Sequence, residues 1–240
     1  MTSDQLILGL TWFVVFLFST TLHEAGHALA AYWMGDPTAY HGGQVSLNPW
    51  PHIRRAPFGM VVAPLASLLL SKGQSLIGWA SAPYDPHWAA SHHRRAAVMA
   101  AAGPAANLVL VLLSGAAIRI GYLQGIFAVP DQVTYDRLTE AAVQGSLAGA
   151  FAVPLSIFFT LNILLFVFNL LPLPPLDGSA LPPLFMSDKM AETYLDFLHQ
   201  PQLALVGMMV AWQIFSPLFT PIIRFAINHL YPGVIYTFPA

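Results

Sequence analysis

The sequence LILGLTWFVVFLFSTTLHEAGH, from Leu6 to His27, contains no formally charged side chain before Glu24. Its first part, Leu6–Leu22, approaches the roughly 20 apolar residues that an α-helix needs to cross the hydrocarbon of a bilayer. Uncharged runs of similar length recur at three further places, which are Ala96–Ile118, Phe151–Leu171 and Leu203–Ile223. We therefore expect an all-α polytopic membrane protein with four long transmembrane helices.

The overall composition supports a membrane protein. Only 8% of the 240 residues are charged, which is about a third of the roughly 25% usual in soluble domains. The formal net charge is -2 and no basic block occurs, so we expect the lipid bilayer and no nucleic acid among the partners. The chain has no Cys, so it can form no disulfide and can hold a metal only through His, Asp or Glu.

A fifth apolar run, Phe58–Ser71, is too short for an ordinary span and contains Pro64. It is consistent with a re-entrant segment, or with half of a bent hairpin that continues through Gly73–Pro83. Between the first span and this run, residues 38–48 contain a Gly-Gly pair, after which apolar and polar residues alternate. This pattern predicts a short membrane-associated β element, with a surface loop as the alternative.

The cations indicate how the chain is oriented. Arg54 and Arg55 follow the first span, and Arg94 and Arg95 directly precede the second. Because Lys and Arg accumulate on the cytoplasmic side, we expect both flanks to face the cytoplasm from the cell (inner) membrane. We interpret residues 1–240 as a single domain, with a core at about 6–180 and a C-terminal span at about 203–227.

The inner end of the first span carries His23-Glu24-Ala25-Gly26-His27. Residues four apart share one face of a helix, so both imidazoles can reach one metal ion, and zinc suits this set. Glu24 lies beside them and could accept a proton from a water that the metal activates. The alternative is a polar cluster that joins helices by hydrogen bonds.

A catalytic zinc site with two histidines needs a third protein ligand. Asp177 is the carboxylate outside the motif that directly ends a long apolar run, and the three prolines before it interrupt the helix. Irregular backbone at this depth is tolerated where it is buried in protein or lines a polar cavity. The alternative is an interfacial Asp that caps the next segment, with Gly178 as a turn residue.

These motifs together resemble the site-2 protease family of intramembrane zinc metalloproteases. The resemblance rests on His23-Glu24-x-x-His27 and on Asn169-x-x-Pro172-x-Pro174-x-Leu176-Asp177-Gly178. A further match is Gly103-Pro104-Ala105-Ala106-Asn107. The small prokaryotic members that lack a PDZ domain are similar at a set of shorter segments, namely Ser46-Leu47-Asn48-Pro49, His52-Ile53, Gly78-Trp79-Ala80 and Ala102-Gly103-Pro104.

The resemblance implies a role for each matched residue. His23, His27 and Asp177 would bind one zinc ion per chain, Glu24 would act as the general base, and Asn169 would help to hold the substrate backbone or the developing oxyanion. For Asn107 two roles remain open, one in packing the helices together and one in the chemistry. The sequence departs from many small members where Arg54-Arg55 follows His-Ile. We interpret the remaining histidines as solvated loop residues, namely His41, His52, His87, His92, His93, His199 and His229.

The expected activity is hydrolysis of peptide bonds within or near transmembrane segments of membrane-protein substrates, with a regulatory membrane protein as a further partner. Because such a substrate must unwind first, an exposed strand edge near Val45 could hold it by β-augmentation. Two alternatives belong to other classes. One is a non-catalytic membrane scaffold that binds metal, and the other, which we favour less, is a small transporter.

Overall fold

The computed structural model describes residues 2–73 and 75–231. Four helices in this part of the chain are long and apolar enough to cross a membrane, namely α1 (Ser3–Met34), α6 (His93–Leu123), α7 (Ala148–Asn169) and α9 (Pro201–Asn228). The predicted all-α polytopic membrane fold with four spans is confirmed. Three of the helices extend well past their uncharged runs, and the 32 residues of α1 make it about 48 Å long. This exceeds the roughly 30 Å of hydrocarbon, so polar residues fit at its ends.

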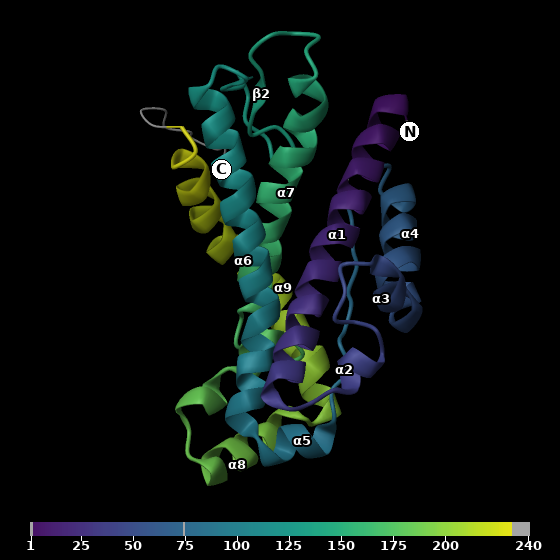
Figure 1. Cartoon of the computed structure of the whole chain (residues 1–240), viewed down its shortest axis with the longest axis vertical. Helices are drawn as coiled ribbons and strands as arrows, with labels where there is room; N and C mark the ends of the chain where they lie inside the picture. Colours follow the sequence, from purple (N-terminus) through teal and green to yellow (C-terminus); the bar gives the residue numbers. More distant parts are fainter. Residues whose placement is uncertain (1, 74, 232–240) are drawn as a thin grey trace.

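The helices pack around α6, which contacts both α1 and α7. In Figure 1, α1 and α6 lie together at the lower end of the view and diverge toward the upper end, where α7 lies between them. Small side chains allow the close approach of α1 and α6, since a Cβ on Gly26 would lie 2.8 Å from Ala102 O and 3.3 Å from Ala106 Cβ.

The fifth apolar run forms a hairpin, one of the two structures that we expected. A π-helical turn, Phe58–Val62, leads into α4 (Ala63–Leu70), at 110° to the preceding α3 (Pro49–Arg55). The chain then returns alongside this helix, because Trp79 N donates to Gly59 O at 3.0 Å and Ile77 N to Ser67 Oγ at 2.9 Å.

The β element predicted at residues 38–48 is wrong. Thr38–His41 forms the short helix α2, and turns and bends follow until Asn48 caps α3. The alternation after the Gly-Gly pair does not reflect a buried apolar face, because the buried side chain there is Gln44, whereas Leu47 is 64% exposed. The described strands lie elsewhere, with β1 (Phe127–Ala128) antiparallel to β2 (Glu140–Ala141).

Short helices cover the end of the molecule where α1 finishes. They are α5 (Pro86–Ser91), the 3-10 segments Asp177–Ala180 and Pro182–Phe185, and α8 (Asp188–Leu198). In Figure 1, α5 and α8 lie at this end, beside the start of α6. The sequence patterns had not predicted these helices.

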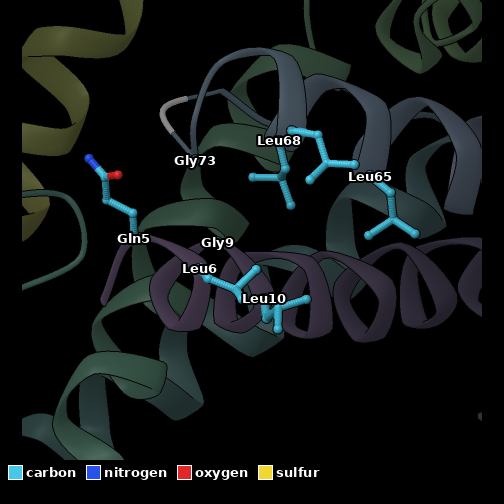
Figure 2. A pocket seen from close by; sticks show the side chains of 8 residues that line it. Gln5, Leu6, Gly9, Leu10, Leu65, Leu68 and Gly73 are labelled. Atoms are coloured by element: carbon cyan, nitrogen blue, oxygen red, sulfur yellow. The ribbon is translucent and has the colours of Figure 1, made fainter. Parts of the chain in front are cut away.

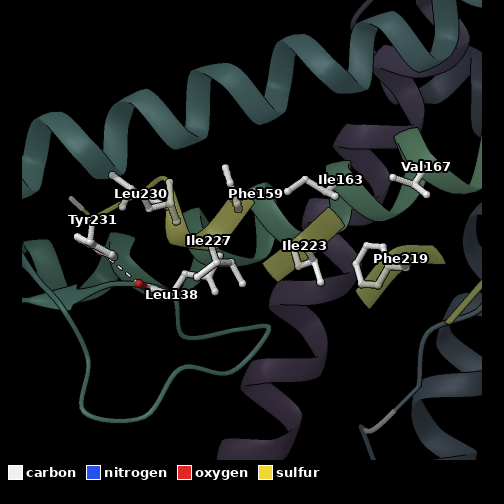
Figure 3. Close-up of a cluster of buried hydrophobic side chains, with 10 residues drawn as sticks. Leu138, Phe159, Ile163, Val167, Phe219, Ile223, Ile227, Leu230 and Tyr231 are labelled. Atoms are coloured by element: carbon white, nitrogen blue, oxygen red, sulfur yellow. Dashed lines mark hydrogen bonds between the residues drawn. The ribbon is translucent and has the colours of Figure 1, made fainter. Parts of the chain in front are cut away.

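A hydrophobic cluster joins α6, α7 and α9 to the loop between α6 and α7, and Figure 3 shows its side chains. Tyr231 Oη donates to Leu138 O at 3.1 Å, which connects the segment after α9 to that loop. The buried members are Ile118, Leu138, Phe159, Ile163, Val167, Phe219, Ile223, Ile227, Leu230 and Tyr231.

An apolar pocket of about 120 Å³ lies between the first turns of α1 and the C-terminal part of α4 (Figure 2). Leucines and glycines make up most of its lining, and Gln5 is its one polar side chain. The pocket is far from the metal motif, because Leu10 and His23 are 13 positions apart on α1, or about 20 Å along the axis. Its lining offers no metal-binding or acid–base group.

Candidate metal centre

His23, Glu24 and His27 lie within α1, which continues to Met34. All three side chains are buried, with exposed fractions of 6%, 5% and 5%. The two histidines are one helical turn apart, so their rings project from the same face of α1 toward α6. Buried histidine and glutamate side chains require partners, and the structure supplies a fourth ionisable group from a distant part of the chain.

Asp177 completes a triangle of possible ligand atoms with the two histidines. The Nε2 atoms of His23 and His27 are 3.0 Å apart, and Asp177 Oδ2 lies 3.1 Å from the first and 3.3 Å from the second. Ligand atoms 2.0–2.1 Å from a tetrahedral zinc ion are separated by about 3.3 Å. The triangle therefore has the dimensions of one face of a zinc coordination sphere.

Asp177 reaches this position through the irregular segment that follows α7. Leu173 N donates to Leu171 O at 2.8 Å, and Leu176 N donates to Leu173 O at 2.9 Å, so the backbone folds back on itself. Gly178 is required at the next position, because a Cβ there would overlap Leu170 O. Asp177 thus points toward α1, and its side chain does not cap the segment that it begins.

Both imidazoles are oriented from α6 through their other ring nitrogen. His27 Nδ1 lies 2.8 Å from Met99 O, and a carbonyl oxygen can only accept, so this nitrogen carries the hydrogen. His27 Nε2 therefore presents a lone pair to Asp177. His23 Nδ1 lies 2.6 Å from Asn107 Oδ1. Asn107 thus joins α6 to α1, which bears out the packing role, and it contacts a candidate ligand, whereas a part in the chemistry stays a prediction.

Gly103 on α6 leaves open the space in front of the two histidines. A Cβ at this position would overlap His27 Nε2 and would lie 2.6 Å from His23 Nε2. The sequence showed Gly103 as part of a motif that matches the family. Its position against the ring nitrogens depends on the crossing of α1 and α6, for which the sequence carried no signal.

Glu24 and Asn169 differ in how they relate to the cluster. Glu24 Oε2 is buried and makes no hydrogen bond with any described residue, whereas the buried Asp177 Oδ2 contacts the Nε2 atoms of both histidines. Two buried carboxylate oxygens beside two imidazoles fit a site that holds a cation. Asn169 is the last residue of α7, and its Nδ2 donates to Leu165 O at 3.0 Å. It is not a member of the three-residue cluster.

The interpretation of the other histidines as solvated loop residues is wrong for His52, which is buried, and it is wrong about the loop for His41, His87 and His93, which lie in α2, α5 and α6. His52 is 1% exposed, and its Nε2 lies 3.1 Å from Ser46 O, so it fixes the loop before α3. His41, His87, His92, His199 and His229 are exposed and His93 is half-buried, and none of them joins the metal-type cluster found among the described residues.

The fold and the cluster define a class of protein, namely a multi-pass membrane protein with a two-histidine, one-carboxylate metal-type site at its transmembrane helices. Comparison with known protein families shows to which family of this class the chain belongs. Residues 11–209 match Peptidase family M50, and the chain belongs to this family, which is the site-2 protease family. The resemblance inferred from the motifs is confirmed.

Curated relatives with similar sequences carry metalloprotease names. "Putative zinc metalloprotease YwhC" of Bacillus subtilis is 33% identical over 166 residues, or 69% of this chain and 64% of that protein. "Putative zinc metalloprotease Rip2" of Mycolicibacterium smegmatis is 31% identical, over 68% of this chain and 52% of its own length. The alignments thus span about half to two thirds of these relatives. No solved structure matches the chain significantly.

Proposed function

We propose that the protein is an intramembrane zinc metalloprotease, with His23, His27 and Asp177 as the zinc ligands. The observation that carries this proposal is the triangle of acceptor atoms with edges of 3.0–3.3 Å. Lone pairs that converge this closely repel one another unless a positive charge lies between them. Zinc fits the nitrogen and oxygen donors, their spacing and the open space at Gly103.

The proposed chemistry is hydrolysis of a peptide bond within or near a transmembrane segment of a membrane protein. When bound, zinc would make a water more acidic and would polarise the scissile carbonyl. Glu24 follows His23 in α1, and its Oε2 is free of hydrogen bonds from the described residues. We assign this atom the general-base role, in which it takes a proton from the attacking water and passes it to the leaving amine.

Asn169 is proposed to help stabilise the oxyanion or hold the substrate backbone. Its Nδ2 donates one hydrogen to Leu165 O and has a second hydrogen to offer. The position at the end of α7, eight residues before Asp177, supports this role. The expected strand edge near Val45, which would have held the substrate, is absent because that segment forms turns and bends.

We further propose that the site faces the cytoplasmic side of the cell (inner) membrane. The expectation from cation placement is supported by the contacts of Arg95, whose Nη1 donates to Met34 O at the end of α1. Arg94 Nη2 donates to Met186 O, near α8, at the same end of the molecule. A transmembrane protein substrate and a regulatory membrane protein are the proposed partners, and residues 1–240 the proposed single catalytic domain.

The test of catalysis compares wild-type protein with Glu24→Gln on a panel of single-span substrates reconstituted in lipid. Loss of the general base should slow cleavage by about 10²–10⁴-fold while zinc remains bound. Glu140→Gln is the matched control, because Glu140 begins β2, between α6 and α7 in the sequence, and pairs with Arg137. Equal cleavage by Glu24→Gln would refute the mechanism, and zinc binding without any cleavage by the wild type would favour the scaffold alternative.

The ligand set is tested separately by zinc affinity. Asp177→Asn should weaken zinc binding by more than the roughly 10–100-fold that loss of an outer partner of a ligand costs. Asp188→Asn, at the exposed start of α8, should leave the affinity unchanged. An Asp177→Asn protein with wild-type zinc affinity would remove Asp177 from the ligand set.

A further inference from the structure

Behind His23, on the side away from the metal-type cluster, the structure contains a fully buried chain of amide groups. Asn107 on α6, Asn162 on α7 and Ser19 on α1 each have an exposed fraction of 0%. Asn107 Nδ2 donates to Asn162 Oδ1 at 2.8 Å. Asn162 Nδ2 in turn donates to Ser19 Oγ at 2.9 Å and to Phe158 O at 2.8 Å. The network links three transmembrane helices, and Asn162 and Ser19 belong to none of the sequence motifs.

The direction of these hydrogen bonds is fixed at the end farthest from the metal-type cluster. Phe158 O is a main-chain carbonyl and can only accept, so the Nδ2 end of the Asn162 amide must face it. The Oδ1 end of Asn162 must then face Asn107. Because this atom is also only an acceptor, it requires the Nδ2 end of Asn107.

The same direction is imposed on His23. With its Nδ2 held by Asn162, and with Ser19 O 3.5 Å from that same nitrogen, Asn107 turns its Oδ1 toward the ring. Asn107 Oδ1 lies 2.6 Å from His23 Nδ1, so Nδ1 carries the hydrogen and Nε2 keeps its lone pair. Turning the Asn107 amide over would place its Oδ1 against two acceptors, Asn162 Oδ1 and Ser19 O. The Asn107 Nδ2 group would then donate to His23 Nδ1, so the ring hydrogen would lie on His23 Nε2, the atom that must bind zinc.

We propose that Asn162 is a positioning residue that sets the tautomer and ring orientation of His23 through Asn107. The proposal rests on the zinc site proposed above and adds to it a residue that touches neither the metal nor the substrate. It differs from a purely structural hydrogen bond between helices, because its effect must pass through Asn107 and reach a particular ring nitrogen.

The first measurement is the zinc dissociation constant, determined by competition with a fluorescent chelator in detergent-solubilised full-length protein. Asn162→Leu should raise this constant by about 10-fold, which is the low end of the effect expected for an outer partner of a ligand. Thr160→Val is the matched control on the same helix. Its Oγ1 is also buried and makes no hydrogen bond with any described residue, so the substitution should leave the constant unchanged.

A double-mutant cycle tests whether Asn162 acts through Asn107. Asn107→Leu should weaken zinc binding at least as much as Asn162→Leu, and adding the second substitution to the first should weaken it no further. The double variant replaces both amides by apolar groups of similar shape. This replacement should destabilise the fold less than a single substitution, which leaves one buried amide without a hydrogen-bond partner. Additive losses of zinc affinity would show a structural role and would overturn the proposal.

Nitrogen-15 spectra of histidine-labelled, zinc-loaded protein give a direct readout of the tautomer. Wild-type His23 should show a hydrogen-bonded Nδ1–H resonance, which shifts or disappears in Asn162→Leu and stays in place in Thr160→Val. If wild-type His23 lacks this resonance, the proposal is overturned, even where Asn162→Leu does not fold. If the wild-type protein binds no zinc, the proposed function is refuted. If the Asn162→Leu variant binds zinc and its His23 Nδ1–H resonance is the same as in the wild type, only the role of Asn162 is overturned.

Discussion

Gly103 determines whether the two histidines can share one ion. A methyl group at this position would occupy the space in front of both Nε2 atoms. We expect Gly103→Ala to reduce zinc affinity by more than about 100-fold, beyond the usual cost of losing an outer partner of a ligand. Zinc content of the purified protein, measured by elemental analysis, tests this expectation.

The control for this substitution is Gly115→Ala on the same helix. A Cβ there would lie 2.9 Å from a ring carbon of Phe159, which is a side chain that can move, and far from the metal-type cluster. Gly115→Ala should therefore keep its zinc. If Gly103→Ala retained zinc as well, the space that we assign to the ion would be wrong.

At the scale of residues, the sequence predicted what depends on local spacing. His23, Glu24 and His27 lie within one and a half turns of a helix, so their common position follows from helical geometry. Asp177 was found because prolines end an apolar run just before it. The partners of these residues could not be predicted, because the contacts of Asn107 and Asn162 depend on how three helices cross.

Asp36 holds together the elements that follow α1. Its carboxylate accepts hydrogen bonds from Thr38 N at 2.9 Å and from Asp85 N at 2.8 Å, and thus joins the starts of α2 and α5. Burial raises the pKa of Asp36, but the hydrogen bonds from the Thr38 side chain and from the two main-chain N–H groups outweigh this effect, and the pKa lies below its ordinary value.

This lowered pKa predicts a pH dependence of stability. The charged form of Asp36 stabilises the fold above the unfolded-state pKa of about 3.9, and this contribution is lost as the pH falls through the lower folded-state value. Asp36→Asn should therefore unfold more easily than the wild type at pH 7, by about 1–3 kcal/mol, and the difference should shrink below pH 4. Denaturant titrations at pH 7 and pH 3 measure it, and a constant difference would contradict the assignment.

Elements that contain a long apolar run were predicted well, and those without one were not. The four spans and the hairpin at residues 58–83 follow from the length and composition of their runs. The prediction for residues 38–48 is wrong because alternation over a few positions reflects a strand only when a partner strand pairs with its backbone and one face is buried. Here the backbone makes local bonds, as when Gln44 N donates to Ala39 O at 2.9 Å.

Across the whole molecule, α9 supports the segment that carries Asp177. Ala211 on α9 packs against Leu171 and Leu176, and Gly207 approaches so closely that a Cβ would overlap Pro174 O. The C-terminal span is therefore a structural support for the metal-type cluster, although it supplies none of the three cluster residues.

This arrangement predicts an effect over a distance. Gly207→Ala should push α9 away from Pro174, destabilise the fold by about 1–3 kcal/mol through overpacking, and weaken zinc binding by about 10-fold. Val206→Ala, at a 51% exposed neighbouring position, should change neither quantity. Thermal unfolding and chelator competition on the two variants measure both effects. Unchanged zinc affinity in Gly207→Ala would show that Asp177 is held independently of α9.

The distance along the chain between the two histidines and Asp177 has a consequence for biosynthesis. A ribosome adds residues in order, so α1, α6 and α7 are complete before Asp177 exists. During that interval the histidines can already contact Met99 and Asn107 on α6, but the third side chain is absent. The nascent protein therefore passes through membrane insertion with an incomplete cluster, and the cluster is completed only when the segment after α7 has emerged and folded back.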